Sequence, residues 1–274
     1  MIVHGCQLDI VWENKPENFK RVRSLLNSRK VSPGSLVVLP EMFATGFSMN
    51  AGLTAEPRDG VTLRFLRELA EDRRAYVLGG LVRRGGRQRT FNEAVCIAPS
   101  GRCAARYDKL QLFTPGCESR HYTAGRDVTL FRWGKLKVAM LICYDLRFPE
   151  LFRLGVQQGA EAFVVIANWP ERRHSHWPAL LQARAIENQA YVIGVNRCGR
   201  DPESGYAGGS VVIDPRGRTM ASSGRKETIV SARLNPSFPS RWRLEFPVLQ
   251  DIRTAIRLKP CRKVSAKING GLNR

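Results

Sequence analysis

The chain has 274 residues, of which 43% are hydrophobic and 25% are charged, which excludes global disorder and allows a substantial core. Its net charge of +20 raises the question of nucleic acid or anionic lipid, but the basic residues are spread along the whole chain, which favours a solvated, arginine-rich surface. No apolar run approaches the roughly 20 residues of a membrane span, and the first residues lack the pattern of a secretory signal, so we expect a cytoplasmic protein.

Short apolar strands and amphipathic helices alternate along the chain, without an internal repeat or a Pro/Gly/Ser-rich linker. The periodicities predict, in chain order, a strand at 2–8, a helix at 17–29, a strand at 35–40, a helix at 61–74, strands at 75–82, 91–98 and 137–143, a helix at 148–159, a strand at 163–168, a helix at 176–189, a strand at 191–196 and a hairpin over 208–218. This alternation is typical of an α/β fold.

The character of the sequence changes after Asp251. Residues 253–274 contain seven basic residues, no acidic ones and little apolar periodicity. We therefore predict one folded domain over 1–252, followed by a mobile basic tail.

The seven cysteines include no CxxC pair, and their spacing does not match a zinc site. Reduced thiols fit this pattern best. His174 and His176 have a two-residue spacing that metal ligands can share, but no third ligand motif lies near them. We therefore expect no metal.

Cys143 has a context that favours chemistry. The segment KLKVAMLICYDLRFPE places it at the end of a predicted buried strand, shortly before a helix that begins near Pro149. A turn of this kind directs a side chain out of the core and leaves backbone N–H groups beside it, which suits a nucleophile and its oxyanion. The alternative is a buried structural thiol at a strand end.

Two other segments carry charged residues in apolar surroundings. Glu41 follows a short apolar strand and is either a surface loop residue or a partly desolvated general base. Lys109 precedes an apolar stretch, and Glu118 follows nine residues later. Each residue alone is more typical of a protein surface, so their significance depends on their occurring together.

Together, LPE at 39–41, YDK at 107–109 and ICYDLRFPE at 142–150 resemble the nitrilase, or carbon-nitrogen hydrolase, superfamily over roughly residues 1–250. The longer strings LPEMFATGFSMN, ANWPERRHSHWPALLQARAIENQAYVIGVNR and GGSVVIDPRG are similar to its bacterial omega-amidase branch, whose members release ammonia from 2-oxoglutaramate or 2-oxosuccinamate. The resemblance implies a four-layer αββα sandwich, usually paired into a homodimer, and an amidase that needs no cofactor.

The resemblance also implies a role for each charged residue. Cys143 would attack the amide carbon and form a thioester, with Glu41 as general base. Lys109 would stabilise the oxyanion together with the backbone N–H of Tyr144, and Glu118 would orient the substrate and the lysine. Amide hydrolysis does require a strong nucleophile, a positive charge and a proton donor for nitrogen. We further expect Lys109 to lower the pKa of the thiol and increase its thiolate fraction.

Two residues are candidates for substrate binding beside Tyr144. Arg147 follows the cysteine by four residues and either binds the carboxylate of a 2-oxo acid or forms a structural ion pair with Asp145 or Glu150. Trp169, after a predicted strand, either forms a wall of the acyl pocket or covers the core.

Other functions stay open from the sequence. A nitrile hydrolase or an N-carbamoyl hydrolase of the same superfamily is the main alternative, because pocket specificity is not read reliably from sequence. A nucleic-acid-binding protein on a hydrolase scaffold would explain the charge of +20. The intact set of four catalytic positions argues against that alternative.

Overall fold

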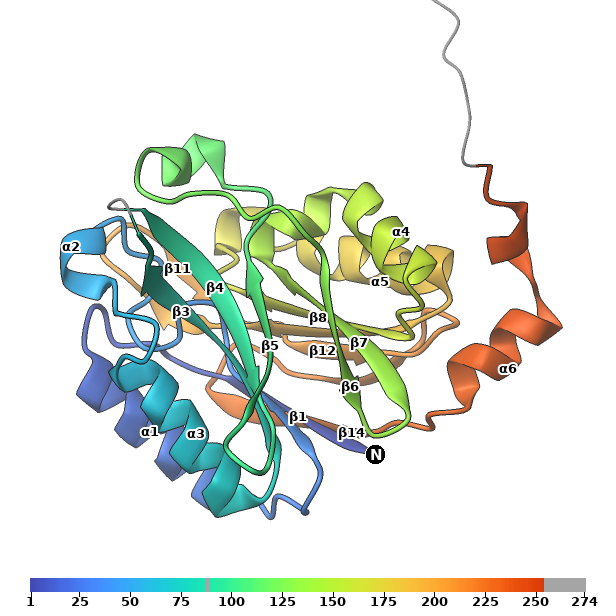
Figure 1. The fold of residues 1–274 in the computed structure, drawn as a ribbon, viewed down its shortest axis with the longest axis horizontal. Helices are drawn as coiled ribbons and strands as arrows, with labels where there is room; N and C mark the ends of the chain where they lie inside the picture. The colour runs from blue at the N-terminus through green and yellow to red at the C-terminus, as the bar shows by residue number, and fades with distance from the viewer. Residues whose placement is uncertain (87–88, 254–274) are drawn as a thin grey trace, which may run out of the picture.

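The computed structural model describes residues 1–86 and 89–253. Two six-stranded β-sheets pack face to face, and helices cover both outer faces (Figure 1), which gives the expected four-layer αββα sandwich. Within the described residues, no helix is both long and apolar enough to cross a bilayer. Apart from Arg253, the predicted basic tail lies outside the described residues.

The first sheet has the strand order β14-β1-β2-β3-β4-β5 and the second has the order β13-β12-β9-β8-β7-β6. The strands of the first sheet are β1 (Ile2–Gln7), β2 (Leu36–Val38), β3 (Tyr76–Arg84), β4 (Thr90–Ile97), β5 (Cys103–Asp108) and β14 (Thr228–Arg233). Those of the second are β6 (Thr129–Trp133), β7 (Leu136–Ile142), β8 (Ala162–Ala167), β9 (Tyr191–Asn196), β12 (Val211–Ile213) and β13 (Thr219–Ser222), and a separate hairpin pairs β10 (Cys198–Arg200) with β11 (Gly205–Ala207).

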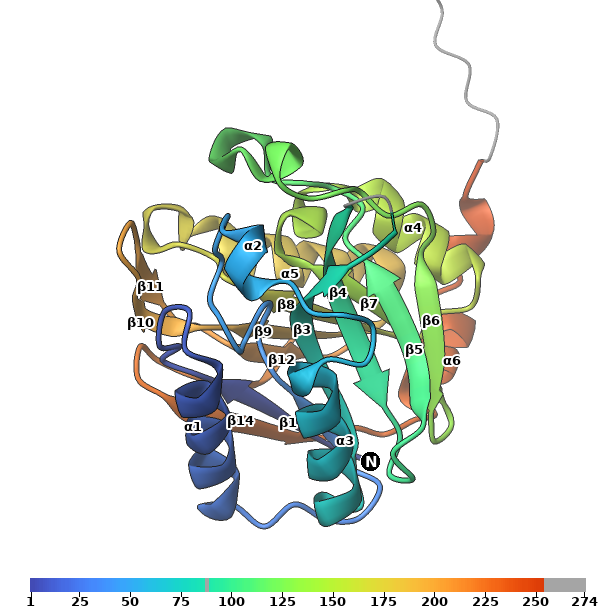
Figure 2. The ribbon, with the colours of Figure 1, turned by 60° about the vertical axis from the view of Figure 1, so that its left-hand side comes forward.

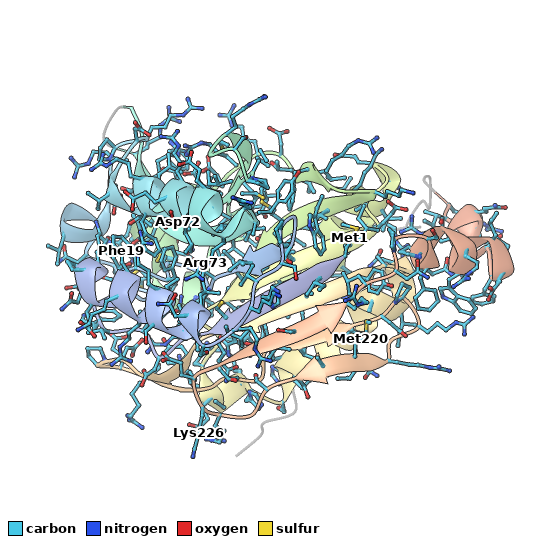
Figure 3. The ribbon with its side chains drawn as sticks, turned by 90° about the horizontal axis from the view of Figure 1, so that it is seen from below. Met1, Phe19, Asp72, Arg73, Met220 and Lys226 are labelled. Atoms are coloured by element: carbon cyan, nitrogen blue, oxygen red, sulfur yellow. The ribbon has the colours of Figure 1, made fainter. Side chains whose placement is uncertain are left out.

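Two helices lie side by side on the outer face of the first sheet (Figure 2). They are α1 (Lys15–Asn27) and α3 (Val61–Arg73). Phe19 of α1 stacks on Phe65 of α3 at a ring-centroid distance of 4.3 Å, and Arg23 of α1 forms an ion pair with Asp72 of α3 at 3.0 Å. Figure 3 shows Phe19 and Asp72 on these neighbouring helices, seen from below. The helices of the structure are α1 (Lys15–Asn27), α2 (Ala51–Thr54), α3 (Val61–Arg73), α4 (Pro149–Gln157), α5 (His176–Asn188) and α6 (Phe238–Glu245).

The apolar patterns explain this layering. On α1, Val22 and Leu26 are fully buried against the first sheet, as expected of an amphipathic helix. The central strands β8 and β9 lie between the helical layers, and every one of their residues is buried. A strand that is buried on both faces has a continuous apolar sequence, and such sequences predicted the strands at 163–168 and 191–196.

The strand directions bring several loops to one end of the sandwich. Strands β1, β2 and β3 run parallel, as do β7, β8 and β9. In open α/β sheets, ligands bind beyond the carboxyl ends of the parallel strands. Glu41, Cys143 and Asn168 all follow the carboxyl ends of such strands.

Candidate active site

Cys143 begins a short 3₁₀ helix, η3 (Cys143–Arg147), directly after β7. Its φ is +46°, in the left-handed region that a non-glycine residue occupies at a cost and that is concentrated at functional sites. The side chain is partly exposed and lines a pocket, and its Sγ lies 3.9 Å from the carbonyl oxygen of Asn168. The strand therefore presents the thiol to the pocket, as the sequence context predicts.

Three charged residues that are far apart in the sequence meet behind this cysteine. Lys109 Nζ lies 2.9 Å from Oε1 of Glu41 and 2.9 Å from Oε2 of Glu118. All three side chains are completely buried. We call these residues the charged cluster. The structure thus brings together the four positions that the resemblance to the superfamily singled out.

Two asparagines complete the charged cluster, and sequence reasoning missed both. The Asn92 side chain donates to Glu41 and to Glu118. The backbone N–H of Asn168 donates to Oε2 of Glu41 at 2.8 Å, and its side chain donates to the Glu41 backbone carbonyl at 2.7 Å. Asn92 could have been identified because it is a polar residue inside the buried strand segment FNEAV. Asn168 could have been identified because it directly follows the buried strand β8.

A glycine allows the loop that carries Glu41 to approach the sheet. A Cβ atom at Gly80 would lie 2.6 Å from the backbone nitrogen of Met42 and 2.7 Å from Cα of Glu41. Backbone hydrogen bonds link Gly80 to Pro40 and to Phe43 on either side of Glu41. Only a residue without a side chain fits there.

The charges in the site act on the Cys143 thiol in opposite directions. Burial and the carboxylate of Glu41 raise the pKa of Cys143 well above its ordinary value, and the positive charge of Lys109 offsets this only in part. Lys109 lowers the pKa of the thiol, as expected, but burial and Glu41 outweigh the lysine. The thiol is neutral at rest and must lose its proton as it reacts.

Lys109 itself stays charged. Burial alone would lower the pKa of its ammonium group, but the carboxylates of Glu118 and Glu41 raise it above its ordinary value. A permanently charged donor in a buried site suits the stabilisation of an oxyanion.

Asp145 joins the Cys143 turn to the loop that carries Lys109. Its carboxylate accepts hydrogen bonds from the Tyr107 hydroxyl at 2.7 Å, the Gln111 N–H at 2.8 Å and the Ile142 N–H at 2.8 Å. Burial raises the pKa of Asp145 to about 6, although these hydrogen bonds lower it in part. The network holds the nucleophile turn and the lysine loop in fixed relative positions.

The pocket in front of the thiol has a volume of about 140 Å³, room for a small molecule. The aromatic side chains of Trp169, Tyr144 and Phe113 form part of its wall, and Arg147 and Arg173 also line it. Trp169 is also buried and packs on Trp177, so it both lines the pocket and contributes to the core. Arg173 was not singled out by the sequence analysis.

The ion pair considered for Arg147 does not form. Among residues 1–86 and 89–253, Arg147 has neither Asp145 nor Glu150 as an ion-pair partner. Its guanidinium instead lies 4.7 Å from the centroid of the Trp169 ring and 3.2 Å from Nδ1 of His176. In the described part of the chain, no group of three or more His, Cys, Asp or Glu residues is arranged to hold a metal ion.

Comparison with known proteins agrees with this arrangement. The carbon-nitrogen hydrolase family model matches residues 4–244. The chain therefore belongs to the carbon-nitrogen hydrolase family, and it is a hydrolase that acts on amides.

Among its relatives, the omega-amidase YafV of Yersinia enterocolitica is 36% identical over 89% of this chain and 94% of that protein. The 2-oxoglutaramate amidase of Bacillus subtilis is 33% identical over 90% of this chain and 95% of that protein. A superfamily structure from Xanthomonas campestris, with an arsenic adduct in its active site, has a TM-score of 0.87 and 32% identity over 94% of this chain and 98% of that one.

Proposed function

We propose that this amidase is an omega-amidase, which hydrolyses the side-chain amide of small 2-oxo dicarboxylate monoamides such as 2-oxoglutaramate and 2-oxosuccinamate. The observation that carries the proposal is the pairing of the amide-hydrolysing residues with arginines in one small pocket. The similarity to an omega-amidase and to a 2-oxoglutaramate amidase points to the same substrates.

In the first half of the reaction, Glu41 takes the proton of the Cys143 thiol as the sulfur attacks the amide carbon. The carbonyl oxygen becomes an oxyanion, which Lys109 and the backbone N–H of Tyr144 stabilise. Glu41 then gives the proton to the amide nitrogen, the C–N bond breaks, and ammonia leaves from a thioester. Because the resting thiol is neutral, proton transfer accompanies the attack.

In the second half, Glu41 takes a proton from a water molecule, which attacks the thioester carbon. The C–S bond breaks, and the proton returns to the sulfur as the 2-oxo acid leaves. Glu118 keeps Lys109 in place throughout, because both of its carboxylate oxygens accept hydrogen bonds from the ammonium group. This mechanism uses no metal and no organic cofactor.

Arg147 and Arg173 would bind the carboxylate of the substrate. Among the described residues neither guanidinium is paired with a carboxylate. Burial and the nearby charges of Arg172 and Arg147 lower the pKa of Arg173. A bound carboxylate would relieve this crowding of positive charge, so the pocket favours an anionic amide.

Replacement of either arginine by glutamine tests this assignment. We expect Arg173→Gln and Arg147→Gln to lower kcat/KM for 2-oxoglutaramate by about 10- to 100-fold, as for loss of a charged hydrogen bond. A small neutral amide serves as the control substrate, and its hydrolysis should change little. Equal losses on both substrates would contradict carboxylate binding.

The nitrile and N-carbamoyl alternatives are separated from the omega-amide by a substrate profile. Ammonia release from 2-oxoglutaramate, a nitrile and an N-carbamoyl amino acid is compared for the wild type and for Cys143→Ala. We expect the wild type to prefer the omega-amide and Cys143→Ala to be inactive on every substrate. A preference for the nitrile or the N-carbamoyl compound would overturn the proposed substrate class.

We also propose that the enzyme acts in the cytoplasm as a homodimer and that nucleic acid is not its partner. Leu154 on α4 and Ile186 on α5 are exposed apolar residues on the helical layer of the second sheet, where a second copy would cover them. Sedimentation of the purified protein tests the dimer.

A further inference from the structure

Asn92, on β4, contacts every member of the charged cluster. Its Nδ2 donates to Oε1 of Glu41 at 2.7 Å and to Oε1 of Glu118 at 2.8 Å. Its backbone carbonyl accepts the N–H of Lys109 at 2.9 Å. The side chain is completely buried and does not line the pocket, so Asn92 acts on the site from behind.

The orientation of this amide is fixed by charge. An amide nitrogen carries two N–H donors, and both are used by carboxylates. The opposite orientation would direct the amide oxygen at two carboxylates. The oxygen Oδ1 has no hydrogen-bond partner among the described residues, which is costly for a buried polar atom. Stability alone therefore does not explain an asparagine here.

The two oxygens of Glu41 are consequently not equivalent. Oε1 accepts from Lys109 at 2.9 Å and from Asn92 at 2.7 Å, so both of its lone pairs are occupied. Oε2 accepts the backbone N–H of Asn168 at 2.8 Å, with the Asn168 side chain farther away at 3.4 Å. The Cys143 sulfur lies 3.9 Å from the carbonyl oxygen of Asn168, the residue whose backbone N–H binds Oε2.

We propose that Asn92 is a positioning residue that makes Oε2 of Glu41 the proton-carrying atom. By holding Oε1, it prevents the carboxylate from rotating and directs Oε2 to the thiol and to the leaving nitrogen. It also separates Glu41 from Glu118, because one amide group lies between the two carboxylates. The inference rests on the proposed role of Glu41 as general base.

The role predicts a change in pH dependence that a purely structural asparagine would not cause. The titratable and charged groups that face Glu41 are Lys109 at the end of β5, Glu118 in η2 (Glu118–Arg120), Cys143 in η3 and Tyr122. Loss of the Asn92 donor leaves two carboxylates with one hydrogen bond fewer each, which favours their protonated forms. The acidic limb of kcat/KM should therefore move to higher pH.

The test compares Asn92→Leu, which has a similar size and no donor, with Asn92→Asp, which keeps the shape. The matched control is Asn188→Leu on α5, since Asn188 is also completely buried and its Oδ1 has no partner among the described residues, but its side chain donates only to residues of its own helix. We measure kcat, KM and the pH profile, with Tm as the measure of folding. Any amide that the wild type hydrolyses serves as substrate, so a wrong substrate class does not affect the result.

For both Asn92 variants we expect kcat to fall by about 10- to 100-fold, the range caused by small misplacements of reacting groups, with KM nearly unchanged. The acidic limb for Asn92→Leu should lie at higher pH than for the wild type, whereas Asn188→Leu should lower Tm alone. Folded Asn92 variants with a wild-type kcat and an unchanged acidic limb would overturn the inference. If Asn92→Leu does not fold, the kcat of Asn92→Asp decides between the two outcomes.

Discussion

At the scale of single residues, the charges around Cys143 determine when its thiol loses a proton. Burial and Glu41 keep the proton on sulfur, and Lys109 opposes them. A neutral thiol is a weak nucleophile toward an amide until a base removes its proton. In the proposed mechanism, the same carboxylate that raises the pKa of the thiol accepts its proton, so the nucleophile forms only as the substrate is attacked.

If Glu41 both raises the pKa of the thiol and accepts its proton, one substitution of Glu41 should make the Cys143 thiol more acidic and yet lower kcat. Glu41→Gln removes the negative charge beside the thiol, so the pKa of Cys143 should fall, although burial still raises it. At the same time, kcat should fall at least about 10²-fold, because the general base is lost. Thiolate absorbance near 240 nm, taken as the difference from a Cys143→Ala background, should appear at lower pH in Glu41→Gln than in the wild type. The opposite order of titration would contradict the electrostatic account.

The sequence predicted the charged residues of the site better than the amides that support them. Glu41, Lys109 and Cys143 stand in short motifs whose order indicates a family. Asn92 donates to Glu41 across 51 residues of chain, and Asn168 does so across 127. Contacts of such long range depend on how the two sheets pack, and no local periodicity contains that information. The effect of Lys109 on the thiol pKa was predicted with the right direction, whereas the larger opposing effect of burial is set by the fold and was not foreseen.

At the scale of elements, the position of Glu41 depends on the strand beside its loop. Gly80 on β3 donates to the carbonyl of Pro40 and accepts from the N–H of Phe43. Its missing side chain lets the Glu41 backbone lie directly against the strand. The sheet thus fixes the position of Glu41, the proposed general base, through backbone contacts.

We predict that Gly80→Ala disables the enzyme through Glu41. The added Cβ would lie 2.6 to 2.7 Å from backbone atoms of Met42 and Glu41, which must move, and a displacement of about 1 Å can reduce the rate about 10²-fold. Gly79→Ala is the matched control, because its Cβ would meet only side-chain atoms of Phe43 and Leu66 at 3.2 to 3.3 Å. It should lower Tm and keep a near-normal kcat. Similar kcat values for the two variants would contradict the role of Gly80.

The predicted elements agree with the structure where the apolar pattern is strong. The predicted helix at 176–189 and strand at 191–196 correspond to α5 and β9. Three strands, β5, β6 and β14, were not predicted from the sequence. Their residues are partly exposed, and polar and apolar types are mixed. Edge strands of this kind gain their stability from a neighbouring strand, so their own sequence carries a weak signal.

At the scale of the whole molecule, we predict that part of the basic excess is separable from the amidase. Seven of the positive charges lie in residues 253–274, which follow the last helical turn. We predict that deletion of these residues leaves kcat and Tm nearly unchanged and weakens retention on heparin, most clearly at low salt. Loss of activity or of the dimer in the truncated protein would show that the domain boundary near residue 252 is wrong.

The pairing of β1 with β14 has a consequence for how the chain reaches its active form. The register joins Ile2 to Arg233, and Met1 and Leu234 extend the pairing. The outer neighbour of β1 is therefore a strand that is synthesised much later. At about 5 to 20 residues per second, the edge of β1 stays open for roughly 10 to 45 s, and an open edge invites pairing with other chains. The chain contains both Glu41 and Cys143 long before the sheet beneath Glu41 is complete. We therefore expect active enzyme to form late, after β14 has been made, with the nascent chain dependent on chaperones until then.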